Sequence, residues 1–176
     1  MSDEVELRRA ELSDTDAVRR LTRQAYAKWV PLIGREPKPM QADHELAVRE
    51  HRIDLLYSDG VLAGLVETID QGDRLLVENV AVQPSFQGRG LGRRLMAHAE
   101  DVARALGHRR IWLCTNKRFE ENVRLYWSLG YAVEREEDLG GGTVRVDMAK
   151  SLDAESTPTS RDLPSSSREF SRSLRR

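Results

Sequence analysis

The sequence predicts a single α/β domain in which helices flank a mixed β-sheet, and three observations support this. Strand patterns alternate with helix patterns in the order β-α-α-β-β-β-α-β-α-β-β along residues 1–150. One long amphipathic helix follows a strand through a glycine-rich loop at residues 88–92. The chain has 176 residues, 39% of them hydrophobic, which is enough for one substantial core.

The first expected elements are a strand and a helix. In residues 5–9, apolar Val5 and Leu7 alternate with charged residues, which indicates a short strand. Ser13 and Asp16 have the spacing of a capping box, so we expect a helix to begin there. The apolar residues of this helix fall on one stripe: Ala17, Val18, Leu21, Ala25 and Trp29.

Proline and glycine interrupt the pattern after the first helix. Pro31, Gly34, Pro37 and Pro39 predict an irregular loop, because proline lacks a backbone donor and glycine favours turns. A second helix is expected over residues 42–52.

The middle of the chain is typical of strands. Residues 53–57 and 61–69 alternate or run apolar, and Ser58-Asp59-Gly60 between them is a hairpin signal. Residues 74–82 predict a further strand that leads directly into the glycine-rich loop.

The second half predicts two more helices and three more strands. The periodic residues 88–106 indicate a long helix that Gly107 ends as a C-cap. The apolar run at 110–114 predicts a buried strand, and a helix closed by Gly130 is expected next. That helix covers residues 119–129, and two last strands cover 131–135 and 143–148.

Composition excludes several classes of protein. The formal net charge is −1 and the pI is near 6.4, so we expect neither nucleic-acid binding nor attraction to an anionic membrane. No apolar run approaches the roughly 18 residues of a membrane span, and the charged N-terminus is unlike a secretory signal. The single Cys114 excludes an internal disulfide and a multi-cysteine metal site, and the four histidines have no ligand spacing. We therefore expect a cytoplasmic protein without a metal.

Residues 151–176 differ in composition from the rest of the chain. Serine, arginine and proline dominate there, and only a few apolar residues are scattered among them. Such a segment cannot bury enough apolar area to offset its chain entropy. The sequence therefore predicts a domain over residues 1–150 followed by a disordered tail.

The glycine-rich loop is the most informative stretch of the sequence. Residues 83–92 carry three alternating glycines that open the long helix, where unpaired amides and the positive dipole end favour an anion such as a pyrophosphate. A P-loop is excluded because no Lys-Ser or Lys-Thr pair follows these glycines. The dinucleotide fingerprint is excluded because Arg93 stands where its third glycine belongs.

The spacing Gln87-x-x-Gly90-x-Gly92 resembles the acetyl-CoA motif of the GNAT superfamily, the Gcn5-related N-acetyltransferases. The resemblance extends to Val82-Gln83-Pro84 before the loop and to the element order over residues 5–150. It also includes Asn122, Tyr126 and Gly130-Tyr131, which resemble the superfamily's closing motif with one residue fewer between Asn122 and Tyr126. The resemblance implies an acyl-CoA N-acyltransferase fold with a mixed, mostly antiparallel sheet.

This resemblance implies an acetyl-CoA site. Backbone amides of residues 87–92 would bind the pyrophosphate, and Arg89 and Arg93 would add positive charge. The strand at 80–82 would pair with the pantetheine arm, and Asn122 would hydrogen-bond it. The implied cofactor-binding residues are Val80, Ala81, Val82, Gln87, Gly88, Arg89, Gly90, Leu91, Gly92, Arg93 and Asn122.

Acetyl transfer to an amine needs a base for the amine, a donor for the carbonyl oxygen and a proton for the departing thiolate. By resemblance, Tyr126 would be the general acid and Glu78 the general base, with Glu78 and Val80 on one strand face. The amide of Val80 or Ala81 would be the oxyanion donor. A covalent route through Cys114 is disfavoured because it lies in an apolar strand without a nearby histidine. The expected reaction is direct transfer in a ternary complex, without a metal.

The acceptor is less specified than the donor. The superfamily usually shapes its acceptor pocket with the segment between the first two helices, here residues 29–43. Asp43, His44 and Glu67 are candidate contacts for an ammonium group, beside the alternative that they are surface residues. The preferred acceptor is a primary amine of a small molecule or peptide. The alternatives are a protein lysine or N-terminus, and a non-catalytic acyl-CoA-binding domain; a homodimer is a further expectation.

Overall fold

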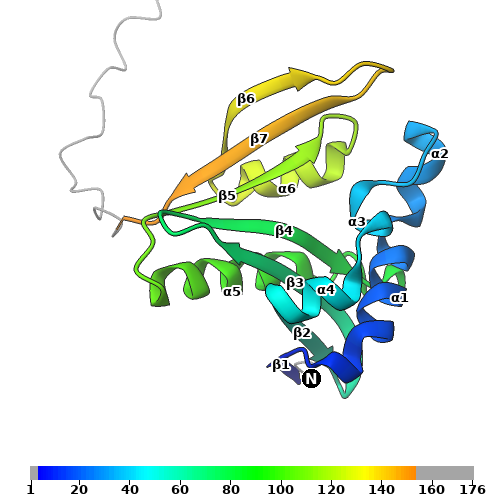
Figure 1. Ribbon diagram of the computed structural model, residues 1–176, viewed down its shortest axis with the longest axis vertical. Helices are drawn as coiled ribbons and strands as arrows, with labels where there is room; N and C mark the ends of the chain where they lie inside the picture. Colours follow the sequence, from blue (N-terminus) through cyan, green and yellow to red (C-terminus); the bar gives the residue numbers. More distant parts are fainter. Residues whose placement is uncertain (1–3, 154–176) are drawn as a thin grey trace, which may run out of the picture.

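The computed structural model describes residues 4–153 and contains one seven-stranded sheet with the order β1-β2-β3-β4-β5-β7-β6 (Figure 1). Every neighbouring pair is antiparallel except β4 and β5, which are parallel. This confirms the mixed, mostly antiparallel sheet. The strands are β1 (Val5–Arg9), β2 (Arg52–Ser58), β3 (Val61–Asp70), β4 (Leu75–Val82), β5 (Arg110–Asn116), β6 (Ala132–Asp138) and β7 (Val144–Ser151).

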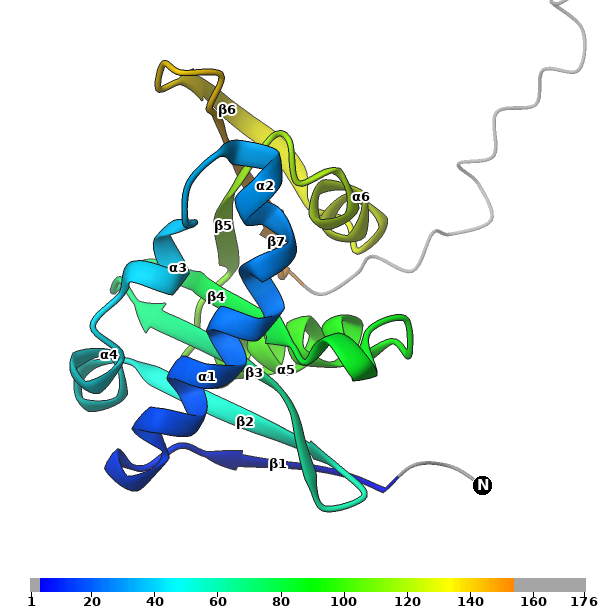
Figure 2. The ribbon, with the colours of Figure 1, turned by 90° about the vertical axis from the view of Figure 1, so that its right-hand side faces the viewer.

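Helices cover both faces of this sheet. Figure 2 shows α1 to α4 on one side of the sheet and α5 and α6 on the other. No helix within residues 4–153 is both long and apolar enough to cross a membrane. The α-helices are α1 (Thr15–Tyr26), α2 (Val30–Ile33), α3 (Lys38–Gln41), α4 (His44–Glu50), α5 (Leu91–Ala105) and α6 (Glu120–Ser128). The 3-10 turns are η1 (Leu12–Asp14), η2 (Ala27–Trp29) and η3 (Pro84–Phe86).

Each face of the sheet has its own apolar core. Leu95, Met96 and Ala99 of α5 are fully buried against strand residues such as Ile111. On the opposite face, α1 packs its buried stripe mainly on β4 and β3, and Ile53 and Leu55 of β2 belong to the same core. The two cores together hold the central strands between two helical layers, which explains why β2, β3 and β4 are mostly apolar on both faces.

The segment expected to be an irregular loop contains two short helices, so that prediction is wrong. Pro31 and Pro39 each occupy one of the first two positions of a helix, α2 and α3, where a proline needs no hydrogen bond from its nitrogen. Gly34 ends α2 in the left-handed conformation, with φ of 73°. Trp29, just before α2, stacks on Phe119 with ring centroids 4.5 Å apart, which ties this segment to the start of α6.

Two helix starts also differ from the sequence prediction. A capping box forms two residues earlier than expected, between Glu11 and Asp14, and the Glu11 amide donates to the Asp14 carboxylate at 2.8 Å. The long helix α5 begins at Leu91, not at Gly88. Gly88 and Gly90 have φ of 78° and 79°, a conformation outside a right-handed helix.

The hairpin between β2 and β3 is confirmed. Ser58 pairs with Val61, and the two residues between them, Asp59 and Gly60, have φ of 49° and 76°. At the other end of the described chain, β7 runs through Ser151 and Leu152 is buried in the core. The rest of the predicted tail, from residue 154, lies outside the described residues.

The pairing of β4 with β5 is short, and this shapes the rest of the molecule. Only Leu75, Leu76 and Val77 of β4 have partners on β5, namely residues 111–113. Beyond Val77 the two strands diverge (Figure 1). The sheet therefore opens between its first four strands and its last three, toward the carboxyl ends of β4 and β5.

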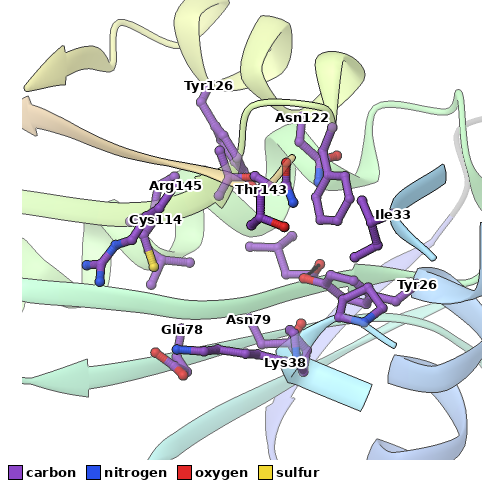
Figure 3. A pocket seen from close by; sticks show the side chains of 18 of the residues that line it. Tyr26, Ile33, Lys38, Glu78, Asn79, Cys114, Asn122, Tyr126, Thr143 and Arg145 are labelled. Carbon is purple, nitrogen blue, oxygen red and sulfur yellow. Dashed lines mark hydrogen bonds between the residues drawn. The ribbon is translucent and has the colours of Figure 1, made fainter. Parts of the chain in front are cut away.

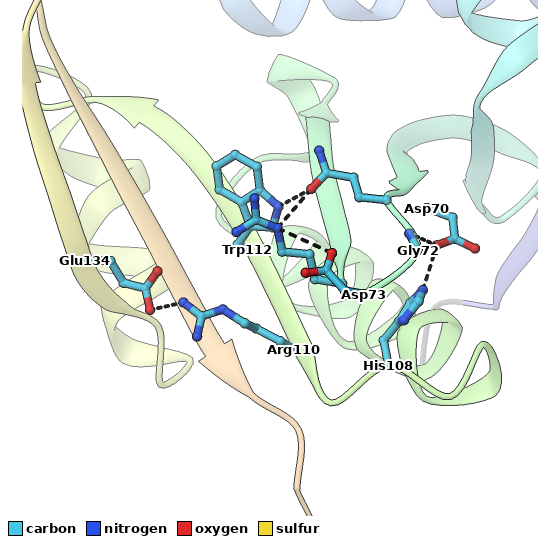
Figure 4. Close-up of polar contacts among 9 residues, drawn as sticks. Asp70, Gly72, Asp73, His108, Arg110, Trp112 and Glu134 are labelled. Atoms are coloured by element: carbon cyan, nitrogen blue, oxygen red, sulfur yellow. Dashed lines mark hydrogen bonds and ion pairs between the residues drawn. The ribbon is translucent and has the colours of Figure 1, made fainter.

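Polar contacts hold the closed end of this opening (Figure 4). His108, before β5, contacts the Asp70 carboxylate at 2.7 Å, and the Trp112 indole donates to Gln71 at 2.8 Å. Arg74 lies over the Trp112 ring, 4.5 Å from its centroid. The β3–β4 loop is thus fixed to the start of β5 where the two strands pair.

Candidate active site

The gap between β4 and β5 contains a cavity of about 160 Å³, which we name the β-gap cavity. Its walls come from β4, β5, β7, α6 and the α1–α3 segment (Figure 3). Glu78 and Asn79 enter from β4, while Asn122 and Tyr126 enter from α6. The cavity therefore brings together residues that lie about fifty positions apart in the sequence.

A second cavity, of about 390 Å³, lies against the glycine-rich loop, and we name it the loop cavity. Its lining includes Gln87, Gly88, Gly90, Leu91, Gly92 and Arg93. Four residues line both cavities: Tyr26, Val80, Asn122 and Tyr126. The two cavities thus meet beside the Tyr126 ring and the open edge of β4.

The loop in front of α5 presents backbone amides to the loop cavity. The two positive-φ glycines, Gly88 and Gly90, shape it, and an added Cβ at either would meet nothing within 4 Å. The 15-residue helix α5 follows with its N-terminus toward the cavity, where its first amides and dipole favour an anion. The Gln87 side-chain Nε2 donates to the Val82 carbonyl at 3.1 Å and fixes the loop to β4.

The outer edge of β4 is open at Val80. The Tyr26 hydroxyl donates to the Val80 carbonyl at 3.2 Å, so that carbonyl points away from β3. In an antiparallel ladder the amide and carbonyl of one residue face the same way, so the Val80 amide also faces the gap. Val80 pairs with Val66 of β3 and Ala81 with Leu65, and successive residues of a strand alternate in direction, so the Ala81 amide and carbonyl face β3 and its side chain is buried in the core.

The two candidate arginines differ in position. Arg93 lines the loop cavity and donates to the Ser128 hydroxyl at 2.8 Å. Arg89 lies over the Phe86 ring, 5.0 Å from its centroid, and does not line either cavity. Leu91 is 6% exposed and packs in the core, so only its backbone can serve a ligand.

Tyr126 lies at the junction of the two cavities. Its side chain is 8% exposed, and its ring makes an edge contact with Tyr131 at 6.2 Å between centroids. Burial raises the pKa of the Tyr126 hydroxyl to about 12, so the group keeps its proton at neutral pH. Asn122 lies one turn earlier on α6 and lines the same junction.

Glu78 lines the β-gap cavity together with Val80, from the strand face predicted for both. A bulge places it there: Glu67 pairs with Asn79 and Thr68 pairs with Val77, which leaves Glu78 without a partner on β3. Loss of hydration in the cavity wall raises the pKa of the Glu78 carboxyl, and the nearby Glu67 adds to the rise. A carboxylate with a raised pKa is a stronger base than an ordinary glutamate.

Cys114 is exposed to the β-gap cavity, which corrects its expected place in a buried strand. It lies just past the last residue of β5 that pairs with β4, where one strand face opens. Partial desolvation raises the pKa of its thiol, and no histidine lines this cavity within the described chain. The thiol is therefore not activated as a nucleophile.

The three candidate ammonium contacts lie outside the β-gap cavity. Asp43 caps α4 by accepting from the Leu46 amide at 3.0 Å, and His44 is 2% exposed. Glu67 is bonded to His51 Nδ1 at 2.6 Å. Arg35 and Lys38 line the cavity from residues 29–43, the segment expected to shape the acceptor pocket. Sequence reasoning did not connect Tyr26 and Arg145 with the cavity, because they come from separate elements.

Comparison with known proteins gives the family. The family described as acetyltransferase (GNAT) family matches residues 16–131, more than half of the chain. Mouse N-alpha-acetyltransferase 80 is 43% identical over 72 residues, which cover 41% of this chain and 23% of that protein. Streptothricin acetyltransferase of Streptomyces lavendulae is 36% identical over 77 residues, covering 43% and 41% respectively. The chain thus matches less than half the length of either relative.

Solved structures share the fold at lower identity. The ribosomal-protein-S18-alanine N-acetyltransferase from Escherichia coli superposes with a TM-score of 0.69 at 20% identity, covering 89% of this chain and 99% of that one. The PaiA N-acetyltransferase from Thermoplasma acidophilum, solved with coenzyme A, gives 0.71 at 16% identity, covering 84% and 99%. The family match, the glycine-rich loop before α5 and the opening between β4 and β5 agree, and the chain belongs to the acetyltransferase (GNAT) family.

Proposed function

We propose that this chain is an N-acetyltransferase that moves an acetyl group from acetyl-CoA to a primary amine. The observation that carries the proposal is the meeting of two cavities at Tyr126 and Val80. One cavity has the features of an anion-binding site, and the other contains a carboxylate with a raised pKa. Donor and acceptor can therefore reach a common point from opposite sides.

The residues of the loop cavity fit acetyl-CoA. Amides of residues 87–92 would bind its pyrophosphate, with Arg93 beside them. The open edge of β4 at Val80 and the side chain of Asn122 would hold the pantetheine arm. When bound, the thioester supplies the acetyl group. Arg89 and the side chains of Ala81 and Leu91 are less suited to a direct contact, because none of the three faces the junction.

Three groups of the chain would serve the transfer. Glu78 would take the proton of the acceptor amine, since its carboxylate lies in the acceptor cavity with a raised pKa. The Val80 amide, which faces the gap, would donate to the carbonyl oxygen as charge develops there. The Tyr126 hydroxyl would hold its proton through neutral pH and donate it as a hydrogen bond to the departing sulfur.

The acceptor would be a small amine or the end of a peptide. The β-gap cavity of about 160 Å³ lies below the roughly 300–1,000 Å³ of pockets for drug-sized ligands. The names of similar proteins include both kinds of acceptor, streptothricin and an alanine of ribosomal protein S18. Transfer would be direct, because the Cys114 thiol has a raised pKa and no histidine beside it.

The test is release of free thiol from acetyl-CoA against a panel of amines, with thermal stabilisation by CoA measured in parallel. The panel contains polyamines, aminoglycosides, amino acids, aryl amines and short peptides. Release with one class would support the enzyme and identify its acceptor class. Stabilisation without release would favour a domain that binds acyl-CoA only, and the absence of both signals would refute the proposal.

A further inference from the structure

The charged side chains of the β-gap cavity are mostly cationic. Arg35, Lys38 and Arg145 line it, and Glu78 is the only acidic residue that does so within the described chain. A simple amine is itself a cation at neutral pH, so three cations in the acceptor cavity oppose its entry. The excess of positive charge instead favours an acceptor that also carries an anionic group.

Two of these cations have no carboxylate partner within residues 4–153. Lys38, on α3, makes no ion pair there, and Arg35 approaches only the Thr143 hydroxyl, at 3.5 Å. Arg145 is bound to Asp147 through Nε at 2.7 Å, and its terminal nitrogens make no ion pair within residues 4–153. Lys38 is therefore the cation best placed to bind an anion without first breaking a pair.

The cations and the base gather at one side of the cavity. Figure 3 shows the side chains of Lys38 and Arg145 extending toward the side where Glu78 and Cys114 lie, away from Asn122. Both cations act on the Glu78 carboxyl and lower its pKa in part, which is consistent with this proximity. Positive and negative groups so close suit a molecule whose amine and anion are separated by only a few atoms.

The rest of the cavity wall is largely apolar. Ile33 of α2, Phe119 before α6 and Leu139 of the β6–β7 turn line it, together with Val77 and Leu113 of the paired strand segments. An apolar side chain of the acceptor would bury area there, at about 25 cal/mol per Å². The cavity thus offers contacts for three chemical groups at once: an amine, an anion and an apolar side chain.

We propose that the acceptor is a free α-amino acid with an apolar side chain, its carboxylate bound by Lys38 with Arg145 and its amine facing Glu78. The proposal rests on the proposed function and names the substrate class of the same site. In the reaction Glu78 first takes a proton from the acceptor ammonium, which leaves the neutral amine. The N–C bond then forms as the thioester C–S bond breaks, the Tyr126 hydroxyl gives its proton to the departing sulfur, and the second proton of the attacking nitrogen returns to Tyr126. The products are an N-acetyl amino acid and the free CoA thiol.

The first experiment compares matched acceptors that differ only in the carboxylate: L-leucine, L-leucinamide and 3-methylbutylamine. Thiol release gives kcat/KM for each with acetyl-CoA. We expect leucine to exceed the other two by about tenfold or more, as for loss of a hydrogen bond to a charged group. Phenylalanine, phenylalaninamide and phenethylamine repeat the comparison with a larger side chain.

The second experiment tests the residue that binds the carboxylate. In Lys38→Met, the ratio of kcat/KM for leucine over leucinamide should fall about tenfold, mainly through a higher KM for leucine. Lys117→Met is the matched control, since Lys117 pairs with Glu136 and does not line either cavity, and its ratio should equal that of the wild type. Stabilisation by CoA reports whether each variant is folded.

The outcomes separate this inference from the proposed function. Equal turnover of leucine, leucinamide and 3-methylbutylamine would overturn the inference but would still support the proposed N-acetyltransferase activity. Turnover of a peptide with acidic residues after its N-terminus, without turnover of leucine, would also overturn it. If no amine reacts, calorimetry with leucine and CoA decides: absence of leucine binding overturns the inference. Absence of CoA binding refutes the proposed function itself.

Discussion

Replacing Tyr126 by phenylalanine tests the chemistry of the site with little disturbance of the fold. The ring packs in the core and is kept by the substitution, and no hydrogen bond of the hydroxyl occurs within residues 4–153. The free energy of unfolding should therefore change by less than about 0.5 kcal/mol. The hydroxyl has a pKa of about 12, so at pH 8 only about one molecule in 10⁴ has lost the proton that the reaction uses.

Removal of a positioned proton donor lowers turnover by about 10²–10⁴-fold, which is about 2.7–5.4 kcal/mol in the activation free energy. The assay is kcat from thiol release with a saturating amine, beside the Kd of CoA by calorimetry. We expect kcat to fall by that factor and Kd to stay within about threefold. A kcat within threefold of the wild type would refute the role of Tyr126.

Tyr131→Phe is the matched control for this experiment. The Tyr131 hydroxyl donates to Glu100 at 3.2 Å, and the side chain is 1% exposed. Removal of the Tyr131 hydroxyl should lower the free energy of unfolding by about 1 kcal/mol and leave kcat unchanged. The two variants thus separate loss of catalysis from loss of stability.

Three further predictions concern the base, the loop and the fold. Glu78→Gln should remove the acid limb of the pH–rate profile, because only the ionised form of Glu78 accepts a proton. In the wild type this limb lies above pH 4.5, because the pKa of Glu78 is raised. An unchanged profile would exclude Glu78 as the base. Gly90→Ala should strain a residue with φ of 79° by about 1–2 kcal/mol and weaken CoA binding in calorimetry. Gly60→Ala, with φ of 76° in the remote hairpin, should show similar strain with normal CoA affinity. Asp54→Asn should destabilise the protein in urea by about 1–3 kcal/mol, because the buried Asp54 carboxylate contacts His98 at 3.0 Å and Arg52 at 2.7 Å.

The effect of Asp54 should also depend on pH in a defined direction. Burial opposes its charge, but the close contacts with His98 and Arg52 outweigh burial and lower the pKa of Asp54 below its ordinary 3.8. A lowered pKa contributes stability that is present above pH 3.8 and is lost as the pH falls through the folded-state value. The difference in the free energy of unfolding between wild type and Asp54→Asn should therefore narrow below pH 3.8. A difference that stays constant with pH would exclude the Asp54 carboxylate as the source of this stability.

Local patterns in the sequence predicted most of the order of strands and helices along the chain, the hairpin and the glycine-rich loop, because each depends on neighbouring residues. Asp59-Gly60 specifies its own turn, and the glycines before α5 adopt the positive φ that their residue type allows. The short helices of residues 30–41 were missed because proline near a helix start and proline in a loop look alike in sequence.

The walls of the acceptor cavity were harder to predict than the loop. Lys38 and Arg145 come from α3 and β7, more than a hundred residues apart, and no spacing rule joins them. Cys114 was expected inside the sheet because its neighbours are apolar, but β4 leaves β5 at that point and uncovers it. Both outcomes depend on the divergence of the two strands, which is a property of the whole sheet.

Because β4 and β5 diverge, a small rotation where the two strands pair is amplified at the far end of β4. β4 and β5 are joined at three residue pairs and by the contacts of Asp70, His108 and Trp112 at the closed end, while the cavities lie at the far end. Val82 lies five residue steps beyond Val77, a length of about 16 Å at about 3.3 Å per residue. A rotation of about 5° at the closed end would therefore move the far end of β4 by about 1.4 Å. Substitutions at Trp112, distant from any reacting atom, would thus alter the width of the opening that the acceptor must enter.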